Sequence, residues 1–346
     1  MTSVLEERLT AQLLAGPPAR DPVAVAERLL AVQAQDPRGA RLAIRARSQG
    51  LTAADVERGL TEDRSLLVTW LNRGTLHLVR SEDYPWLHAL TTPPLFTGSA
   101  RRLAQEGVTP EQAERGVRVI ERWLAEEGPL TRPQLRDEID RAGVPTKGQA
   151  LVHLLMLGSL RGLIVRGPMI GREHAYVLVR DWLGESRPVD RDRALRELAR
   201  RYLVGQGPAS DRDLARWAGL PLRDARAALS AIAPELTERE DGLVDLSGRP
   251  PAAPVPSPQL LGAFEPVLLG WTSREWLLGA HRHLVTVEGL FRPFALVDGR
   301  AAAVWSLRDG EVVLEPFRRL PAKVAAALAN DTREVLRFLD VDRKRD

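Results

Sequence analysis

Two glutamines separated by one residue stand where an apolar helical pattern stops. Gln33 and Gln35 lie in the stretch LLAVQAQDPRGA, and the helix-breaking pair Asp36-Pro37 follows at once. A glutamine side chain offers a carbonyl acceptor and an amide donor without carrying a charge. It cannot remove a proton as His or Glu does, but it can hold a water molecule in a fixed line of attack. That chemistry suits a reaction whose leaving group is already activated, because positioning then matters more than base strength.

The residues alone also allow a plainer interpretation, in which the glutamines cap the helix end or point into solvent. Other catalytic signatures do not occur in the sequence. The absence of cysteine excludes disulfides, thiolate metal sites and the zinc deaminase motif, and His281-Arg282-His283 lacks further ligands at metal spacing. There is no phosphate-binding glycine loop and no nucleophile elbow. We therefore expect no metal and no cofactor.

The composition is that of a globular protein. The chain of 346 residues, 44% of them apolar, can hold two to four modules that share a core. Its first residues, MTSVLEERLTAQLL, form an amphipathic charged stretch unlike a signal peptide, and no apolar run reaches membrane-spanning length. We therefore expect a soluble, cytoplasmic, monomeric protein without membrane association.

The basic residues are almost all arginine. The net charge is only +3, and the lysines are Lys147, Lys323 and Lys344. Arginine favours bidentate contacts with phosphate, so this balance permits nucleic-acid binding. A genome whose base composition favours Arg, Ala, Gly and Pro codons would give the same excess.

A pattern of helices followed by a hairpin recurs three times. In the first copy, Asn72-Arg73-Gly74 reads as the turn of a hairpin, and in the later copies Thr131, Thr146 and Ser210 read as helix N-caps. This is the order of a winged helix, whose second helix usually lies against a DNA groove. The expected helices are 3–14, 23–32, 38–48, 53–59, 110–126, 132–142, 147–159, 192–204, 211–218 and 222–232, and the expected hairpin strands are 66–71, 75–79, 163–166, 175–178 and 243–246.

The chain changes character after a linker rich in Pro and Ala at 248–258. Short apolar or alternating runs follow, and Asp298-Gly299 and Asp309-Gly310 supply hairpin turns. This pattern predicts a small antiparallel barrel or sheet and then a helix at about 322–339. The runs are 260–271, 284–290, 294–297, 301–307 and 311–315.

Two stretches, LLAVQAQDPRGARLAI and VTWLNRGTLHLVRSEDYPWL, taken together resemble the winged-helix DNA glycosylases of the AlkZ type. These are the alkylpurine and crosslink-unhooking glycosylases of the HTH_42 superfamily. LLGAFEPVLLGW and GLFRPFALVDGRAAAVW resemble that family's C-terminal barrel, so the resemblance covers nearly the whole chain. One departure is visible, because Leu261-Gly262-Ala263-Phe264-Glu265 stands where the barrel motif often reads Leu-Pro-x-Phe-Asp.

The resemblance implies an α+β fold with three tandem winged-helix modules around a C-terminal antiparallel β-barrel, forming a concave DNA channel. The expected parts are a first winged helix with the Gln-x-Gln motif at 1–108, a second at 109–186, a third at 187–250, and the β-barrel-like segment with the C-terminal helix at 251–346.

The resemblance also implies a catalytic role for Gln33 and Gln35, because AlkZ-like members carry Gln-x-Gln whereas a sister branch carries Gln-x-Asp. An N7-alkylated guanine is cationic, so its glycosidic bond is already weak. Two glutamine carbonyls can place a water at the C1′ face and tolerate developing oxocarbenium charge. The implied activity is that of a monofunctional DNA glycosylase that hydrolyses the N-glycosidic bond of cationic N-alkylpurines in double-stranded DNA, as in base excision repair.

Bulky natural-product adducts and interstrand crosslinks are further candidate substrates, and self-resistance to an antibiotic is a candidate context. A non-catalytic winged-helix regulator stays open as the alternative function. His77 could reach a phosphate, orient a glutamine, or be a structural histidine bonded to backbone, and Asn72 and Arg73 could be ordinary turn residues. The expected DNA contacts are Arg38, Asn72, Arg73, His77, Lys147, Arg161 and Arg166.

Overall fold

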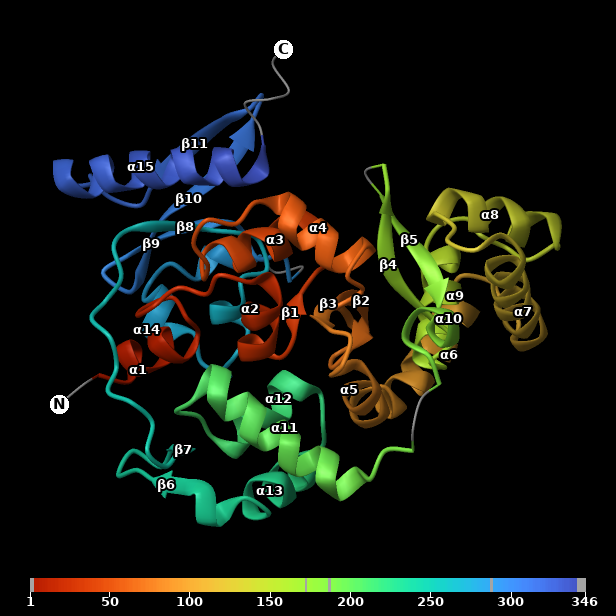
Figure 1. Cartoon of the computed structure of the whole chain (residues 1–346), viewed down its shortest axis with the longest axis horizontal. Helices are drawn as coiled ribbons and strands as arrows, with labels where there is room; N and C mark the ends of the chain where they lie inside the picture. The colour runs from red at the N-terminus through yellow and green to blue at the C-terminus, as the bar shows by residue number, and fades with distance from the viewer. Residues whose placement is uncertain (1–2, 172, 186–187, 287–288, 341–346) are drawn as a thin grey trace. The chain divides into compact units, whose positions relative to one another are not determined.

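The computed structural model describes residues 3–171, 173–185, 188–286 and 289–340. The chain divides into two compact units (Figure 1). The discontinuous unit comprises Met1–Val56 and Leu195–Asp346, and the central unit comprises Glu57–Ala194. These boundaries differ from the expected ones at 108, 186 and 250, since the first expected module contributes residues to both units. The division into four modules stays a prediction.

The first part of the discontinuous unit is helical, and its helices begin where side chains cap them. Ser3 and Glu6 form a capping box at α1, and Asp21 and Asp36 accept backbone N–H groups at α2 and α3. The expected helices 3–14 and 38–48 are therefore present in shorter form. The elements are α1 (Val4–Ala11), α2 (Pro22–Leu29), β1 (Val32–Gln33), α3 (Pro37–Arg45) and α4 (Ala53–Thr61), which leads into the central unit.

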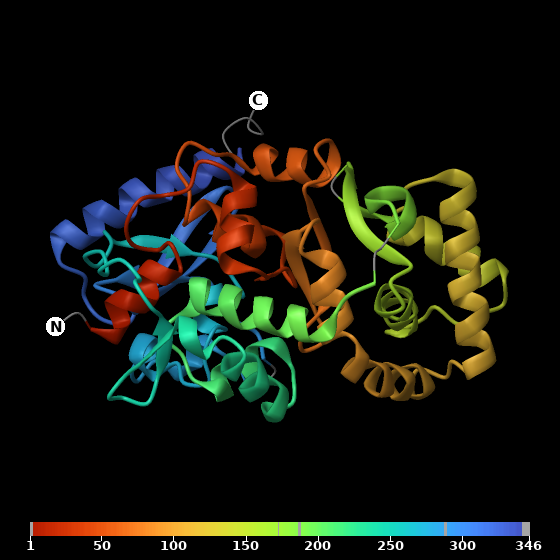
Figure 2. The same cartoon turned by 60° about the horizontal axis from the view of Figure 1, so that its bottom comes forward.

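The third helical copy lies at the start of the second part of this unit. Ser210 caps α12 with Asp213 in a capping box, as expected. Figures 1 and 2 show α11, α12 and α13 gathered beside the β6–β7 hairpin. The elements are α11 (Arg191–Gln206), α12 (Asp211–Ala218), α13 (Leu222–Ser230), η2 (Ala233–Glu235), β6 (Leu236–Glu238) and β7 (Val244–Leu246).

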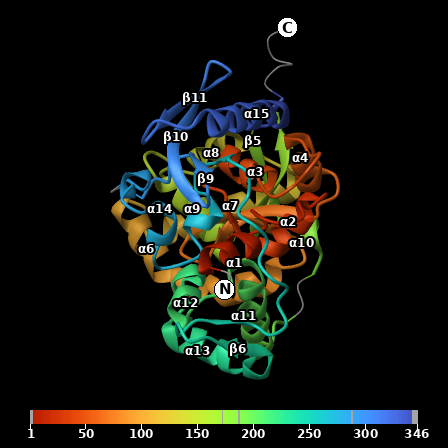
Figure 3. The ribbon, with the colours of Figure 1, turned by 90° about the vertical axis from the view of Figure 1, so that its left-hand side faces the viewer.

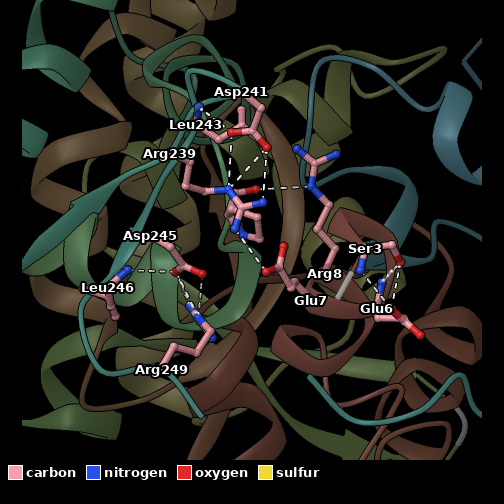
Figure 4. A network of polar contacts seen from close by, with 11 residues as sticks. Ser3, Glu6, Glu7, Arg8, Arg239, Asp241, Leu243, Asp245, Leu246 and Arg249 are labelled. Atoms are coloured by element: carbon pink, nitrogen blue, oxygen red, sulfur yellow. Dashed lines mark hydrogen bonds and ion pairs between the residues drawn. The ribbon is translucent and has the colours of Figure 1, made fainter. Parts of the chain in front are cut away.

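A network of charged side chains joins α1 to the β6–β7 hairpin (Figure 4). Arg239 pairs with Glu7 at 3.0 Å and with Asp241 at 3.2 Å, so the hairpin turn and α1 share one cation. Arg8 is buried and donates its Nε–H to the Pro208 carbonyl at 3.1 Å. These contacts attach the N-terminal helix to a segment some 200 residues later in the chain.

The C-terminal strands form an open sheet. The antiparallel order is β11-β10-β9-β8, and among the residues that the structure describes no pairing closes β11 onto β8, so the expected barrel is not confirmed. In the run 260–271 the strand ends at Leu261, and a short 3-10 turn follows at Pro266–Leu268. The run 284–290 includes residues 287 and 288, which lie outside the described residues. The elements are β8 (Gln259–Leu261), η3 (Pro266–Leu268), α14 (Glu275–Leu278), η4 (Arg282–Leu284), β9 (Phe294–Val297), β10 (Arg300–Arg308), β11 (Glu311–Pro316) and α15 (Ala322–Leu339).

Helix α15 covers this sheet (Figures 1 and 3). Its buried residues Val335 and Phe338 face the core, and its Asp331 pairs with Arg45 of α3 and accepts the backbone N–H of Leu260 at 2.6 Å. One carboxylate therefore joins the last helix, the first C-terminal strand and α3. The helix has the predicted bounds.

In the central unit, the two expected hairpins join into one antiparallel sheet. Strand β2 pairs with β3 along its length and meets β4 at Val68 and Arg166, so the order is β3-β2-β4-β5. Thr131 caps α8 as expected. Thr146 does not cap a helix at 147, because Gly148 adopts a positive φ and the helix begins only at Ala150.

The helices α5 and α6 and the turn η1 had no counterpart in the expected elements. No helix within the described ranges is long and apolar enough to cross a membrane. The elements of the central unit are β2 (Leu66–Leu71), β3 (Thr75–Arg80), α5 (Tyr84–Thr91), η1 (Pro93–Leu95), α6 (Phe96–Gln105), α7 (Pro110–Glu127), α8 (Arg132–Arg141), α9 (Ala150–Leu160), β4 (Ile164–Ile170), β5 (Glu173–Leu178) and α10 (Val179–Leu183).

Candidate active site

The two glutamines lie in a short loop between α2 and α3. Helix α2 ends at Leu29 because Leu30 has a positive φ of 65° with ψ −45°, outside the helical region, and the expected continuation to residue 32 is wrong. The chain then extends through β1, so Gln33 belongs to a strand and not to a helix end. Asp36 starts α3 by accepting the Arg38 N–H at 3.0 Å, and Pro37 occupies the first helical position.

The two amides have opposite exposure. Gln33 is buried, with 6% exposure, whereas Gln35 is exposed. Successive side chains in an extended segment alternate between faces, so residues two apart would share one face in a regular strand. Here β1 ends at Gln33, and the turn into α3 directs Gln35 outward. One amide is thus fixed by packing while the other can meet a substrate.

The backbone at the start of α3 packs directly against the backbone of the turn 261–265. A Cβ on Gly39 would overlap the carbonyl oxygen of Ala263, and a Cβ on Gly262 would lie 3.0 Å from the Cα of Gly39 and from the Cβ of Leu42. Both glycines are buried. The first turn of α3 therefore has one tightly defined position relative to this turn.

The other end of α3 holds a fully buried ion pair. Arg47 donates to a carboxylate oxygen of Glu265 at 2.5 Å, and both side chains are 0% exposed. The same guanidinium donates to the backbone carbonyls of Ala43 at 2.9 Å and Gln12 at 2.7 Å. Because a buried charge is tolerated only when paired and hydrogen-bonded, these contacts account for an arginine inside the core.

The cation nearest to the glutamines in sequence is on the surface. Arg38 lies in the first turn of α3, is exposed, and its side chain has no polar partner among the described residues. Gln35 likewise has no hydrogen-bond partner for its side chain within those ranges. The structure thus keeps three of the predicted site residues, Gln33, Gln35 and Arg38, on one short segment of the discontinuous unit.

Three more of the predicted residues lie in the β2–β3 hairpin of the central unit. Asn72 is 0% exposed with φ 53°, a left-handed conformation that Asn tolerates better than most residues, and Arg73 is half-buried. His77 is 2% exposed, and its Nδ1 lies 2.9 Å from the Thr75 carbonyl, to which a protonated Nδ1 donates. The proposed DNA contacts of this hairpin stay predictions, and the burial of Asn72 and His77 favours the structural alternative.

Burial and the nearby positive charge of Arg73 lower the pKa of His77 to about 3. Its imidazole is therefore neutral at physiological pH. A neutral imidazole cannot neutralise a phosphate, so a role for His77 would have to be that of a hydrogen-bonding group.

Because the pKa of His77 is lowered in the folded state, the folded protein becomes less stable as the pH falls. Between pH 6.5 and about 3 the unfolded chain binds a proton that folded His77 excludes, so the free energy of unfolding decreases as the pH falls, by about 1.4 kcal/mol per pH unit. We expect wild type to lose about 2 kcal/mol more than His77→Gln between pH 6.5 and pH 5, measured by denaturant unfolding. His283→Gln, a change at an exposed histidine, serves as the control. Parallel pH profiles for wild type and His77→Gln would contradict this expectation.

The three predicted residues of the second copy have different environments. Lys147 is exposed and has no polar partner in the described part of the chain, whereas Arg161 forms an ion pair with Glu114. Arg166 is half-buried, with its guanidinium 4.9 Å from the ring of Trp70 and 5.1 Å from that of Tyr176. Lys147 is therefore the member of this set best placed for a phosphate, because the other two already have partners.

Comparison of the chain with known proteins identifies its family. A model of the family "DNA glycosylase AlkZ-like" matches residues 26–338. The chain belongs to the AlkZ-like DNA glycosylase family. It is therefore an enzyme, a glycosylase that acts on DNA, and the non-catalytic alternative is set aside.

The similar curated sequence and the similar solved structure both come from Streptomyces sahachiroi. The chain is 29% identical to an interstrand DNA cross-link repair glycosylase, over 92% of this chain and 91% of the relative. The solved structure of the DNA glycosylase AlkZ superposes with a TM-score of 0.78 at 26% identity, over 98% of this chain and 97% of that chain. The α+β fold is thus that of AlkZ.

Sequence reasoning missed the residues that support the glutamine loop. Glu265 is the one charged residue in LLGAFEPVLLGW, and a charge inside an apolar run is a signal of a buried partner. Arg47 gave no such signal, because it follows a helix rich in arginine and is one of several arginines in that stretch. Among the described residues, no group of three or more His, Asp or Glu side chains could hold a metal ion.

Proposed function

We propose that this glycosylase hydrolyses the N-glycosidic bond of cationic N-alkylpurines, N7-alkylguanine above all, with a water positioned by Gln33 and Gln35. The observation that supports it is a buried and an exposed amide, two residues apart, between the end of α2 and the start of α3. A buried amide beside an outward one suits a reaction that needs placement of water more than proton removal.

In the proposed reaction, the water oxygen forms a bond to C1′ while the C1′–N9 bond breaks. The bonding electrons pass to the purine, whose positive charge they neutralise, so the base leaves without protonation. The attacking water loses its proton to solvent. The glutamine carbonyls accept the water's hydrogen bonds and lie near the oxocarbenium charge as it develops.

We further propose that the three copies of helices and hairpin act as winged-helix modules along a DNA channel, with the enzyme acting as a monomer. Among the predicted contacts, Arg38 and Lys147 are the exposed cations whose side chains have no polar partner in the described ranges, and they would meet phosphates. The name of one relative refers to interstrand cross-links, and bulky or crosslinked N-alkylpurines are therefore proposed as substrates here too. An outward-facing Gln35 is compatible with a base that is not fully extruded.

The test is release of free base from a duplex that contains one N7-methylguanine. We expect an intact abasic strand that breaks only after hot alkali, and no covalent adduct after borohydride treatment. The reason is that a Schiff base needs an amine, and the lysines of the chain, Lys147, Lys323 and Lys344, lie far in sequence from the glutamines. A trapped protein–DNA adduct, or no base release, would refute the proposed mechanism.

A further inference from the structure

The loop 30–36, which carries both glutamines, is bracketed at its two ends by one connected set of contacts. We propose that the turn 261–265 together with Arg47 positions this loop, and with it Gln33 and Gln35, for the glycosylase reaction. The inference rests on the proposed role of the glutamine pair. It adds positioning residues that lie outside the loop and do not touch DNA.

At the downstream end, the turn 261–265 contacts α3 in two places. Gly262 and Ala263 touch the first turn of α3 at Gly39, where no methyl group fits. Glu265 pairs with Arg47, just after the end of that helix, at 2.5 Å and without solvent exposure. Two fixed contacts at opposite ends of a nine-residue helix define both its position and its axis. Because α3 begins at Pro37, two residues after Gln35, these contacts also restrict the position of Gln35.

At the upstream end, Arg47 is connected back to α2. Its guanidinium donates to the Gln12 side chain at 3.0 Å, and the amide of Gln12 donates to the Gly205 carbonyl at 2.8 Å. Gly205 in turn lies against the last turn of α2, where an added Cβ would overlap the Arg28 carbonyl oxygen. The contacts therefore run from the start of α3 to the end of α2, which are the two anchors of the glutamine loop.

All of these contacts are buried, and none involves Gln33 or Gln35. Gln12, Arg47 and Glu265 are each 0% exposed. The set has no surface on which to bind a ligand, so its consequence for the reaction is placement of the loop. Since a displacement of about 1 Å can cost a factor of roughly 10² in rate, loop placement has a measurable effect.

The sharpest test changes the contact without changing a charge. In Gly262→Ala, the new methyl group would lie 3.0 Å from Gly39 and Leu42, closer than ordinary contact, so the turn and the start of α3 must move apart by a few tenths of an ångström. We expect the single-turnover rate of N7-methylguanine release at saturating DNA to fall by about tenfold or more, by the same reasoning on displacement. DNA affinity should stay unchanged. Gly98→Ala, where a Cβ meets nothing within 4 Å, is the matched control and should match wild type.

A double-mutant cycle separates positioning from a general structural role. If Gly262 acts through the glutamine loop, adding Gly262→Ala to Gln35→Ala should cause little further loss of rate. The inference would be overturned if the rate losses of Gly262→Ala and Gln35→Ala multiplied in the double variant. A folded, soluble Gly262→Ala enzyme with the wild-type rate would also overturn it. Either result leaves the proposed function intact as long as Gln35→Ala alone is slow, whereas a fast Gln35→Ala would refute the function itself.

A second variant covers the case in which Gly262→Ala does not fold. Glu265→Asp keeps the charge beside Arg47 and shortens the side chain by one methylene, so the pair must draw the turn and the helix together. We expect the same signature, a lower single-turnover rate with unchanged DNA affinity, in a protein that remains folded by circular dichroism. A folded Glu265→Asp enzyme with the wild-type rate would overturn the inference.

Discussion

Replacing Gln35 with alanine should slow the single-turnover release of N7-methylguanine by roughly 10²–10³-fold, the usual loss for one preorganised polar group. The side chain is exposed and has no partner within the described ranges, so its removal should leave stability and DNA affinity nearly unchanged. Gln49→Ala, at an exposed glutamine beyond the end of α3, is the matched control and should excise at the wild-type rate.

Gln33→Ala should lower the rate by a similar factor but with a second effect. Gln33 is 6% exposed, so its truncation leaves a cavity and lowers the free energy of unfolding as well. The rate should therefore be measured well below the unfolding transition of this variant. Wild-type excision by both glutamine variants would end the proposal that this loop is the active site.

The second large effect concerns the charge of the leaving base. Uracil and 8-oxoguanine, placed in the same duplex, should be released at least 10²–10⁴-fold more slowly than N7-methylguanine, which is the usual contribution of general acid–base catalysis. A neutral base needs protonation as it leaves, and neither glutamine can supply a proton. His77 would not replace them, because its lowered pKa keeps the imidazole neutral.

The comparison uses single-turnover conditions with enzyme in excess, so that product release does not limit the rate. Affinity for each duplex is measured separately, which distinguishes poor chemistry from poor binding. Release of uracil as fast as N7-methylguanine would show that the leaving group needs no prior activation. The argument for water placement by uncharged amides would then fail.

Local signals in the sequence predicted many of the elements correctly. Ser210 and Thr131 cap helices as expected, and the last helix has the expected bounds, because capping and apolar periodicity act within a few residues. Four separated stretches of the sequence indicated the family, which the family model confirms. The role of the glutamine pair stays a prediction.

Features that depend on distant partners could not be predicted in this way. Leu30 ends α2 with a positive φ that leucine rarely adopts, so only the surrounding packing can account for it. The joining of two hairpins through Val68 and Arg166 needs contacts across 98 positions of sequence. Whether the C-terminal strands close into a barrel also depends on pairing between distant strands, and the described strands form an open sheet. The pairing of Arg47 with Glu265 was invisible for the same reason.

The discontinuous unit has a consequence for biosynthesis. The ribosome completes the segment with both glutamines early, but Glu265 lies 218 residues after its partner Arg47. At about 5–20 residues per second, roughly 10–40 s pass before that carboxylate is synthesised. Throughout this interval the nascent helix α3 lacks both of its partners in the turn 261–265, the carboxylate of Glu265 and the backbone at Ala263. The segment with both glutamines is therefore among the first parts of the chain to be synthesised, but its supporting contacts are among the last that can form.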